Sequence, residues 1–252
     1  MKKLIVLVYG AISYLIGMTG LFFLISLLQG WVSTAMSIPD VSFSLRAALI
    51  NISLLLLFSI QHSYMAHHSY KDRFNLSPAA ERATYVLFSG VLMILLFLYW
   101  QPLPHYLWQL PSGSALAILL LTLGWIGWLI VFASTFMVSH ADLFGLRQSW
   151  LQWKQKPYTP LPFKINIFYA LCRHPIMAGF LLAFWATPDM TSSRILFAAG
   201  MTIYILIGIH LEEKGLQTEL GEPYIDYCQR TPKLIPQIFH RHKNAENNSR
   251  RQ

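Results

Sequence analysis

The residues of this chain that are best suited to chemistry form small clusters beside long apolar segments. The first cluster is Leu171-Cys-Arg-His-Pro-Ile-Met-Ala-Gly179. Pro175 suits the first turn of a helix, where its missing N–H costs nothing. The free N–H groups of that turn and the donor fork of Arg173 would together bind a carboxylate or phosphate. Gly179 would let a backbone or a ligand approach closely. The alternative is an arginine at a membrane interface followed by an ordinary helix.

The second cluster is a pair of adjacent carboxylates at the end of the next apolar segment. Glu212 and Glu213 could bind an ammonium or sulfonium cation or an arginine, and the alternative is a solvated helix face. An amphipathic stretch follows them, and we expect it to stop at Gly221. Tyr224 and Tyr227 are three residues apart, so they share one face of a short helix. They could cap a pocket or anchor the helix at an interface.

Histidines make up the remaining clusters. His140 lies close to Asp142, an arrangement suited to accepting a proton, and Arg147 follows; a structural interface loop is the alternative. His62 ends the second apolar segment and is the histidine best placed to face a cavity. Together with the histidines at 67–68 it suggests a metal at first, but their spacing does not place all three on one helix face. We therefore expect no metal site.

The composition shows that much of the chain needs a solvent other than water. Hydrophobic residues make up 55% of the chain and charged residues 12%, against about 25% in soluble domains. The net charge is +8, and the basic residues lie in loops between apolar runs. We therefore expect a lipid bilayer as partner and no nucleic acid. Cys172 and Cys228 lack zinc-finger spacing and are expected as free thiols.

Apolar runs of about 20 residues, the length that crosses a bilayer, predict an all-α polytopic membrane helical bundle with five to six transmembrane helices. The expected helices are 4–28, 45–65, 83–100, 114–138, 175–186 and 195–211. The last two are expected to form a C-terminal helical hairpin, followed by a cytoplasmic amphipathic helix. The first is expected to be a retained helix, because its apolar stretch exceeds the roughly 7–15 residues of a signal peptide.

Lysine and arginine positions predict how these helices are oriented. If the N-terminus is cytoplasmic, all but Arg46 and Arg194 of the 19 basic residues lie on the inner side. We therefore expect both termini in the cytoplasm and the chemical clusters at one cytoplasmic membrane edge. Residues 1–236 would form the membrane domain, and 237–252 would be a disordered basic tail.

Taken together, these residues resemble a known group of membrane enzymes. Arg-His-Pro at 173–175, the two glutamates and Gly-x-x-Tyr-x-x-Tyr at 221–227 look like the cofactor end of isoprenylcysteine carboxyl methyltransferases and phospholipid methyltransferases. The stretches 134–148, 156–163, 184–190 and 61–86 are similar to bacterial methanethiol S-methyltransferases and NnrU-like proteins. Two positions depart from this pattern: Met177 stands where the family has an aromatic residue, and His67 stands where it has an arginine.

This resemblance implies an S-adenosyl-L-methionine-dependent enzyme of the bacterial cytoplasmic (inner) membrane, with its cofactor region at 139–236. It would methylate a small thiol, methanethiol, to dimethyl sulfide. The cofactor's carboxylate would meet Arg173 and the helix that begins at Pro175, and a glutamate would take its ammonium. The residues expected to bind the cofactor are Arg173, His174, Pro175, Gly179, Glu212, Glu213, Tyr224 and Tyr227.

A thiol reacts as its thiolate, so the site needs a base or a positive partner. His140, oriented by Asp142, is the expected base, Arg147 would stabilise the thiolate, and His62 completes the expected catalytic residues. Three alternatives remain: a lipid or isoprenylcysteine-like methyl acceptor, an NADPH-dependent membrane reductase, and a non-enzymatic NnrU-like accessory or transport protein. The sequence leaves the accepted thiol and the oligomeric state open.

Overall fold

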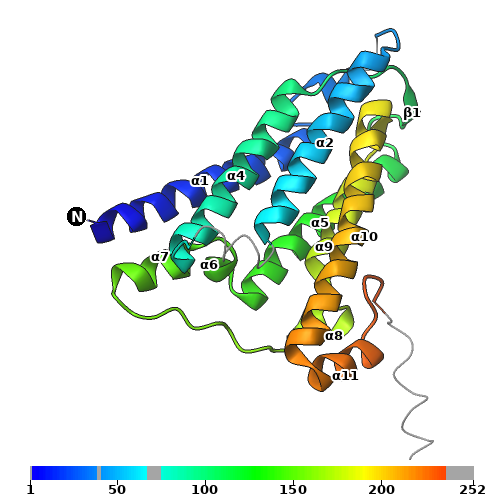
Figure 1. Ribbon diagram of the computed structural model, residues 1–252. Coiled ribbons are helices and arrows are strands. Elements are labelled where there is room, and N and C mark those ends of the chain that lie inside the picture. Colours follow the sequence, from blue (N-terminus) through cyan, green and yellow to red (C-terminus); the bar gives the residue numbers. More distant parts are fainter. Residues whose placement is uncertain (1, 39–40, 67–74, 237–252) are drawn as a thin grey trace, which may run out of the picture.

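The protein is a bundle of tilted helices with a small sheet at one end (Figure 1). The computed structural model describes residues 2–38, 41–66 and 75–236, so the predicted tail and the histidines at 67–68 lie outside the described residues. The elements are α1 (Lys2–Leu28), η1 (Ala35–Ser37), α2 (Leu45–Ala66), α4 (Pro78–Tyr99), β1 (Tyr106–Gln109), α5 (Ala115–Val138), α6 (His140–Leu143), α7 (Leu146–Trp153), α8 (Ile167–Leu171), α9 (Pro175–Trp185), β2 (Asp189–Thr191), α10 (Ser192–Leu220) and α11 (Glu222–Arg230).

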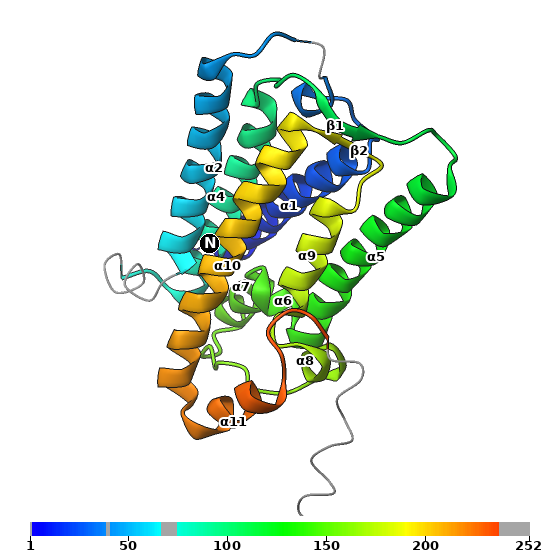
Figure 2. The ribbon, with the colours of Figure 1, turned by 90° about the vertical axis from the view of Figure 1, so that its right-hand side faces the viewer.

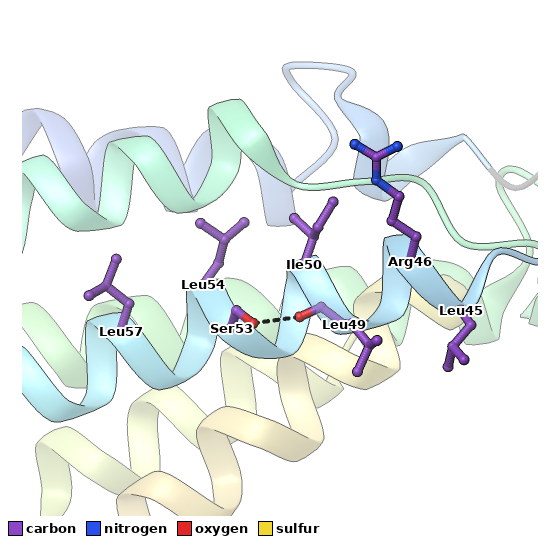
Figure 3. A pocket seen from close by; sticks show the side chains of 7 residues that line it. All are labelled: Leu45, Arg46, Leu49, Ile50, Ser53, Leu54 and Leu57. Atoms are coloured by element: carbon purple, nitrogen blue, oxygen red, sulfur yellow. Dashed lines mark hydrogen bonds between the residues drawn. The ribbon is translucent and has the colours of Figure 1, made fainter.

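Five of the described helices, α1, α2, α4, α5 and α10, are long and apolar enough to cross a bilayer. Their outer faces carry exposed apolar side chains. On α2, Leu45, Leu49 and Leu57 are more than half exposed and line an open groove (Figure 3). Lipid is the solvent that suits such faces. The predicted polytopic helical membrane protein is therefore confirmed. Helix α9 has 11 residues and is too short to cross alone at about 1.5 Å per residue, but the stretch 186–191 that follows it completes the return to the end that carries β2 (Figure 2).

Local capping explains where the helices begin and end. Ser77 accepts a bond from the backbone N–H of Ala80, and Pro78 occupies the first turn, so α4 begins at 78 rather than at 83. Helix α10 continues to 220 rather than ending at 211, because the residues that follow are mostly good helix formers. The expected stop at Gly221 is confirmed, with φ of +62°.

Pairs of glycines bring helices into close contact at two crossings. A Cβ on Gly20 of α1 would lie 2.9 Å from the carbonyl oxygen of Gly90 in α4. A Cβ on Gly127 of α5 would lie 2.7 Å from the carbonyl oxygen of Gly179 in α9. Small residues allow this approach between helices in lipid. Helix α9 precedes α10 in the chain, as in the expected hairpin. Its main packing partner, however, is α5.

The two ends of the bundle differ (Figures 1 and 2). At one end β1 and β2 pair antiparallel, with Trp108 opposite Met190. This sheet was not predicted, because each strand is too short to give an alternating pattern. At the other end lie the short helices α6, α7, α8 and α11. The bundle interior between them is aromatic, and the ring of Phe197 contacts those of both Phe97 and Phe184.

Candidate functional site

A buried ion pair joins the start of α9 to α10 at the end of the bundle opposite the sheet. Arg173 Nε and Nη2 each lie 2.7 Å from Oε1 of Glu213. Arg173 Nη1 donates to the main-chain carbonyls of Cys228, at 2.7 Å, and Thr231, at 2.5 Å. Both charged side chains are 7% exposed. Most N–H groups of this guanidinium are therefore used within the protein, where they hold three segments together.

The two adjacent glutamates have different surroundings. Glu213 Oε1 lies 3.2 Å from His174 Nε2, and its Oε2 lies 3.0 Å from Lys233 Nζ. The side chain of Glu212 is 51% exposed, and its carboxylate lies 3.8 Å from His174 Nδ1. Glu213 is therefore balanced by cations of the protein itself, whereas Glu212 remains open to an added cation. We call Arg173, His174, Glu212, Glu213 and Lys233 the carboxylate cluster.

Main-chain bonds bring Lys233 into this cluster. The N–H of Arg173 donates to the carbonyl of Pro232 at 2.8 Å, and the N–H of His174 donates to the carbonyl of Lys233 at 3.1 Å. The segment after α11 therefore runs along the start of α9. Sequence reasoning did not single out Lys233, because nothing in its local sequence separates it from the other basic residues of the C-terminal region.

Helix α9 begins at Pro175, as expected. Gly179, in contrast, lies against the neighbouring helix α5 rather than at an open site. Pro175 occupies the first turn of α9, and His174 is the residue before the helix. The expected close approach at Gly179 is made by the backbone of α5, since a Cβ there would lie 2.7 Å from the carbonyl oxygen of Gly127. The close contact therefore serves helix packing.

Tyr224 and Tyr227 form an aromatic wall beside the carboxylate cluster. They are 2% and 5% exposed, and the hydroxyl of Tyr227 donates to the carbonyl of Tyr169 at 2.6 Å. Phe163, which the sequence did not single out, packs against both rings with centroid distances of 5.8 and 5.5 Å. Burial raises the pKa of Tyr227 to about 12 and that of Tyr224 further still. Both phenols are therefore protonated at neutral pH.

His140 is not oriented by Asp142, which corrects the expected pair. His140 Nδ1 lies 2.9 Å from the hydroxyl of Thr135, and its Nε2 lies 3.1 Å from the hydroxyl of Tyr14 in α1. Its ring stacks on Phe136 with a centroid distance of 4.5 Å. Side chains two positions apart on a helical turn point about 200° apart, so the two residues face different neighbours. Burial lowers the pKa of His140, which is therefore neutral at pH 7.

Asp142 instead forms an ion pair with Arg147. Arg147 Nη1 lies 2.7 Å from Asp142 Oδ1 and 3.0 Å from the carbonyl of Thr159. Tyr158 donates its hydroxyl to the other carboxylate oxygen at 3.2 Å. The guanidinium of Arg147 therefore binds Asp142 and the loop after α7. These contacts do not support its expected role as the partner of a thiolate.

His62 lies in a network of hydroxyl groups between α2 and α4. Its Nε2 is 2.6 Å from the hydroxyl of Tyr85, and its Nδ1 is 3.1 Å from the hydroxyl of Ser89. The guanidinium of Arg82 lies over the ring of Tyr85 at 5.0 Å. The His62–Tyr85 pair is therefore a second polar network, separate from the carboxylate cluster.

The described residues contain no group of three histidines, cysteines or acids that could hold a metal. Arg173, His174, Glu212 and Glu213 come together as expected, and Lys233 joins them. His140 and the Asp142–Arg147 pair form two separate networks near α6. The same end of the bundle therefore offers an exposed carboxylate, a half-exposed lysine, an aromatic wall and two histidines that are each bonded to tyrosine.

Comparison with known proteins identifies the family. The NnrU protein family matches residues 50–231. The methanethiol S-methyltransferase of Mycobacterium tuberculosis is 40% identical over 96% of this chain and 100% of its own length. Methanethiol S-methyltransferase 2 of Bradyrhizobium diazoefficiens is 45% identical over 82% of this chain and 80% of its own, and a Pseudomonas sp. methanethiol S-methyltransferase is 42% identical over 93% and 91%. No solved structure matches. The chain therefore belongs to the NnrU family and, within it, to the group of the methanethiol S-methyltransferases.

Proposed function

We propose that this protein transfers a methyl group from S-adenosyl-L-methionine to methanethiol at the cytoplasmic face of a bacterial inner membrane. The observation that carries the proposal is the similarity, over 96% of the chain, to a protein named methanethiol S-methyltransferase. Residues 1–236 would be one methyltransferase domain with both termini in the cytoplasm. The donor groups of the carboxylate cluster and its aromatic wall fit the charged and adenosyl parts of this cofactor.

The exposed members of the cluster would hold the cofactor. Glu212 would bind its ammonium, because this carboxylate is half exposed and makes one weak contact, to His174. Lys233, whose side chain is 52% exposed, would bind its carboxylate. Tyr224 and Tyr227 would line the adenosyl part. When bound, the cofactor supplies an electrophilic methyl group on its sulfonium sulfur.

Arg173 and Glu213 would act indirectly in this arrangement. Their bond fixes α9, α10 and the segment after α11 relative to one another, so it positions Glu212 and Lys233. Positioning of this kind supplies much of the rate in group transfers, because the reacting atoms meet in the correct geometry.

The His62–Tyr85 pair would deprotonate the thiol. The Tyr85 oxygen would accept the thiol proton while its own proton passes 2.6 Å to His62 Nε2. The thiolate would then accept the methyl group that the bound cofactor supplies. The products would be dimethyl sulfide, S-adenosylhomocysteine and one proton on His62. We prefer His62 to His140 because its hydrogen bond to a tyrosine hydroxyl is the shorter of the two, at 2.6 Å against 3.1 Å.

Purified protein tests the proposal directly. Incubation with methanethiol and S-adenosyl-L-methionine should release dimethyl sulfide, measured by gas chromatography, and S-adenosylhomocysteine should inhibit competitively. Methanethiol without the cofactor is the control. If the protein binds neither S-adenosyl-L-methionine nor S-adenosylhomocysteine and forms no dimethyl sulfide, the proposed function is wrong.

A further inference from the structure

At the end of the bundle that carries the sheet, Arg194 is buried, and no carboxylate of the described residues forms an ion pair with it. It is 7% exposed. Its Nη1 donates to the hydroxyl of Thr187 at 2.6 Å and to the carbonyl of Asp189 at 3.2 Å, and its Nη2 donates to the carbonyl of Leu27 at 3.3 Å. Its Nε finds no hydrogen-bond partner within the described ranges. A buried charge that makes no ion pair is costly, so this guanidinium can accept an anion.

A small polar cavity of about 150 Å³ lies beside Arg194. Its lining residues are Gly30, Val32, Ser33, Ser37, Tyr106, Asp189, Thr191 and Arg194. Because a water takes about 30 Å³ of the liquid, the cavity has room for a tetrahedral group. The hydroxyls of Ser33, Ser37 and Tyr106 are donors that other described side chains do not use. The cavity therefore combines one cation with several neutral donors.

Helix α10 adds to the positive character of the cavity. The helix has 29 residues and begins at Ser192, where Thr191 caps the N–H of Arg194. The N–H of Ser192 donates to the carbonyl of His105, so the helix contributes its dipole, which favours an anion at this terminus, more than free donors. Asp189 also belongs to the lining, and its carboxylate acts on Arg194 through space without an ion pair between them. It offsets part of the positive charge, which favours a singly charged anion over a doubly charged one.

We infer that this cavity binds a singly charged oxyanion of the phosphodiester type, held by the guanidinium of Arg194 and the hydroxyls of Ser33, Ser37 and Tyr106. The inference does not depend on the proposed methyl transfer, because the cavity lies at the opposite end of the bundle. The guanidinium would reach the oxyanion through Nη2, because Nη1 already makes two hydrogen bonds and Nη2 makes one.

Such a phosphodiester could belong to a membrane phospholipid or to a soluble molecule. Trp31 is 59% exposed at this end and contacts Trp125 at a centroid distance of 5.2 Å. Tryptophans of this kind mark the headgroup level of a bilayer. Both sources share the same chemistry, and the experiment separates them.

The full chain, purified in a detergent without phosphate, should bind dimethyl phosphate in a calorimetric titration, and sulfate should bind more weakly. Tyr106→Phe and Ser37→Ala should each weaken dimethyl phosphate binding roughly fivefold, as expected for one neutral hydrogen bond. Arg194→Lys should weaken it further. Arg46→Gln is the matched control and should change nothing, because this arginine is exposed and lines the groove on α2 (Figure 3).

Native mass spectrometry then identifies the source of the oxyanion. A phospholipid that stays with the wild type and the Arg46→Gln variant, but leaves the Tyr106→Phe variant, assigns the site to a lipid headgroup. Binding of dimethyl phosphate without a retained lipid assigns it to a soluble oxyanion. The inference is overturned if no oxyanion binds and no lipid is retained, or if Tyr106→Phe and Ser37→Ala leave binding unchanged. These two mild variants keep the test valid if Arg194→Lys does not fold.

Discussion

The same substitution at the two adjacent glutamates of α10 should affect different properties, stability at Glu213 and cofactor affinity at Glu212. Glu213→Gln removes the buried charge that balances Arg173 and Lys233. Removing one partner of a buried pair costs about 3–5 kcal/mol, because it leaves the other charge uncompensated. At about 2–4 °C per kcal/mol for a chain of this size, the unfolding temperature should fall by roughly 6–20 °C.

Glu212→Gln should leave stability almost unchanged but weaken the cofactor. The Glu212 side chain is 51% exposed and lies 3.8 Å from its ionic partner His174, so the stability at stake is below about 1 kcal/mol. A charge-assisted hydrogen bond to an ammonium is worth about 1.5–3 kcal/mol. The affinity for S-adenosyl-L-methionine should therefore fall by roughly 10- to 150-fold.

Two measurements on the same purified samples check this difference: thermal unfolding in detergent, and calorimetric titration with S-adenosyl-L-methionine. Glu219→Gln is a matched control, because this glutamate is exposed on the same helix, and it should change neither value. The reasoning is refuted if Glu212→Gln unfolds as early as Glu213→Gln, or if Glu212→Gln binds the cofactor with full affinity.

Three further predictions concern the remaining histidines and a helix crossing. His62→Gln and Tyr85→Phe should lower turnover by roughly 10²–10⁴-fold, the usual share of a general base, without loss of cofactor affinity; unchanged turnover in a dimethyl sulfide assay would exclude the pair. Gly179→Ala should lower stability by about 1–3 kcal/mol in thermal unfolding, because the new Cβ meets the α5 backbone at 2.7 Å, whereas Gly208→Ala has no atom within 4 Å and should cost nothing. Burial lowers the folded-state pKa of His140 below 6.5, so its contribution to stability is complete above pH 6.5 and declines as the pH falls below it. The unfolding temperature measured between pH 8 and 5 should therefore drop less steeply in His140→Gln, and equal slopes would contradict this assignment.

The helix positions followed closely from the sequence. The expected segment 45–65 is α2, and 114–138 is α5 with Ser114 as its cap. The length of an apolar run and its polar flanks determine where a helix crosses a bilayer, and both can be read locally. The start of α4 and the end of α10 were missed because capping and propensity extend helices beyond the apolar run. The sheet was missed because its pairing joins residues 106–109 to 189–191.

The sequence alone determined that this chain is a helical membrane protein whose Arg173 and paired glutamates lie at one end of the bundle. Only the tertiary structure decided that the Glu213 carboxylate is buried in ion pairs while that of Glu212 is half exposed. It brought Lys233 into contact with Glu213. It also separated Asp142 from its expected partner. The physical reason is that neighbours on a helix point about 100° apart, so adjacent residues meet different surroundings. Those surroundings come from segments far away in the chain, whose approach depends on how the helices cross.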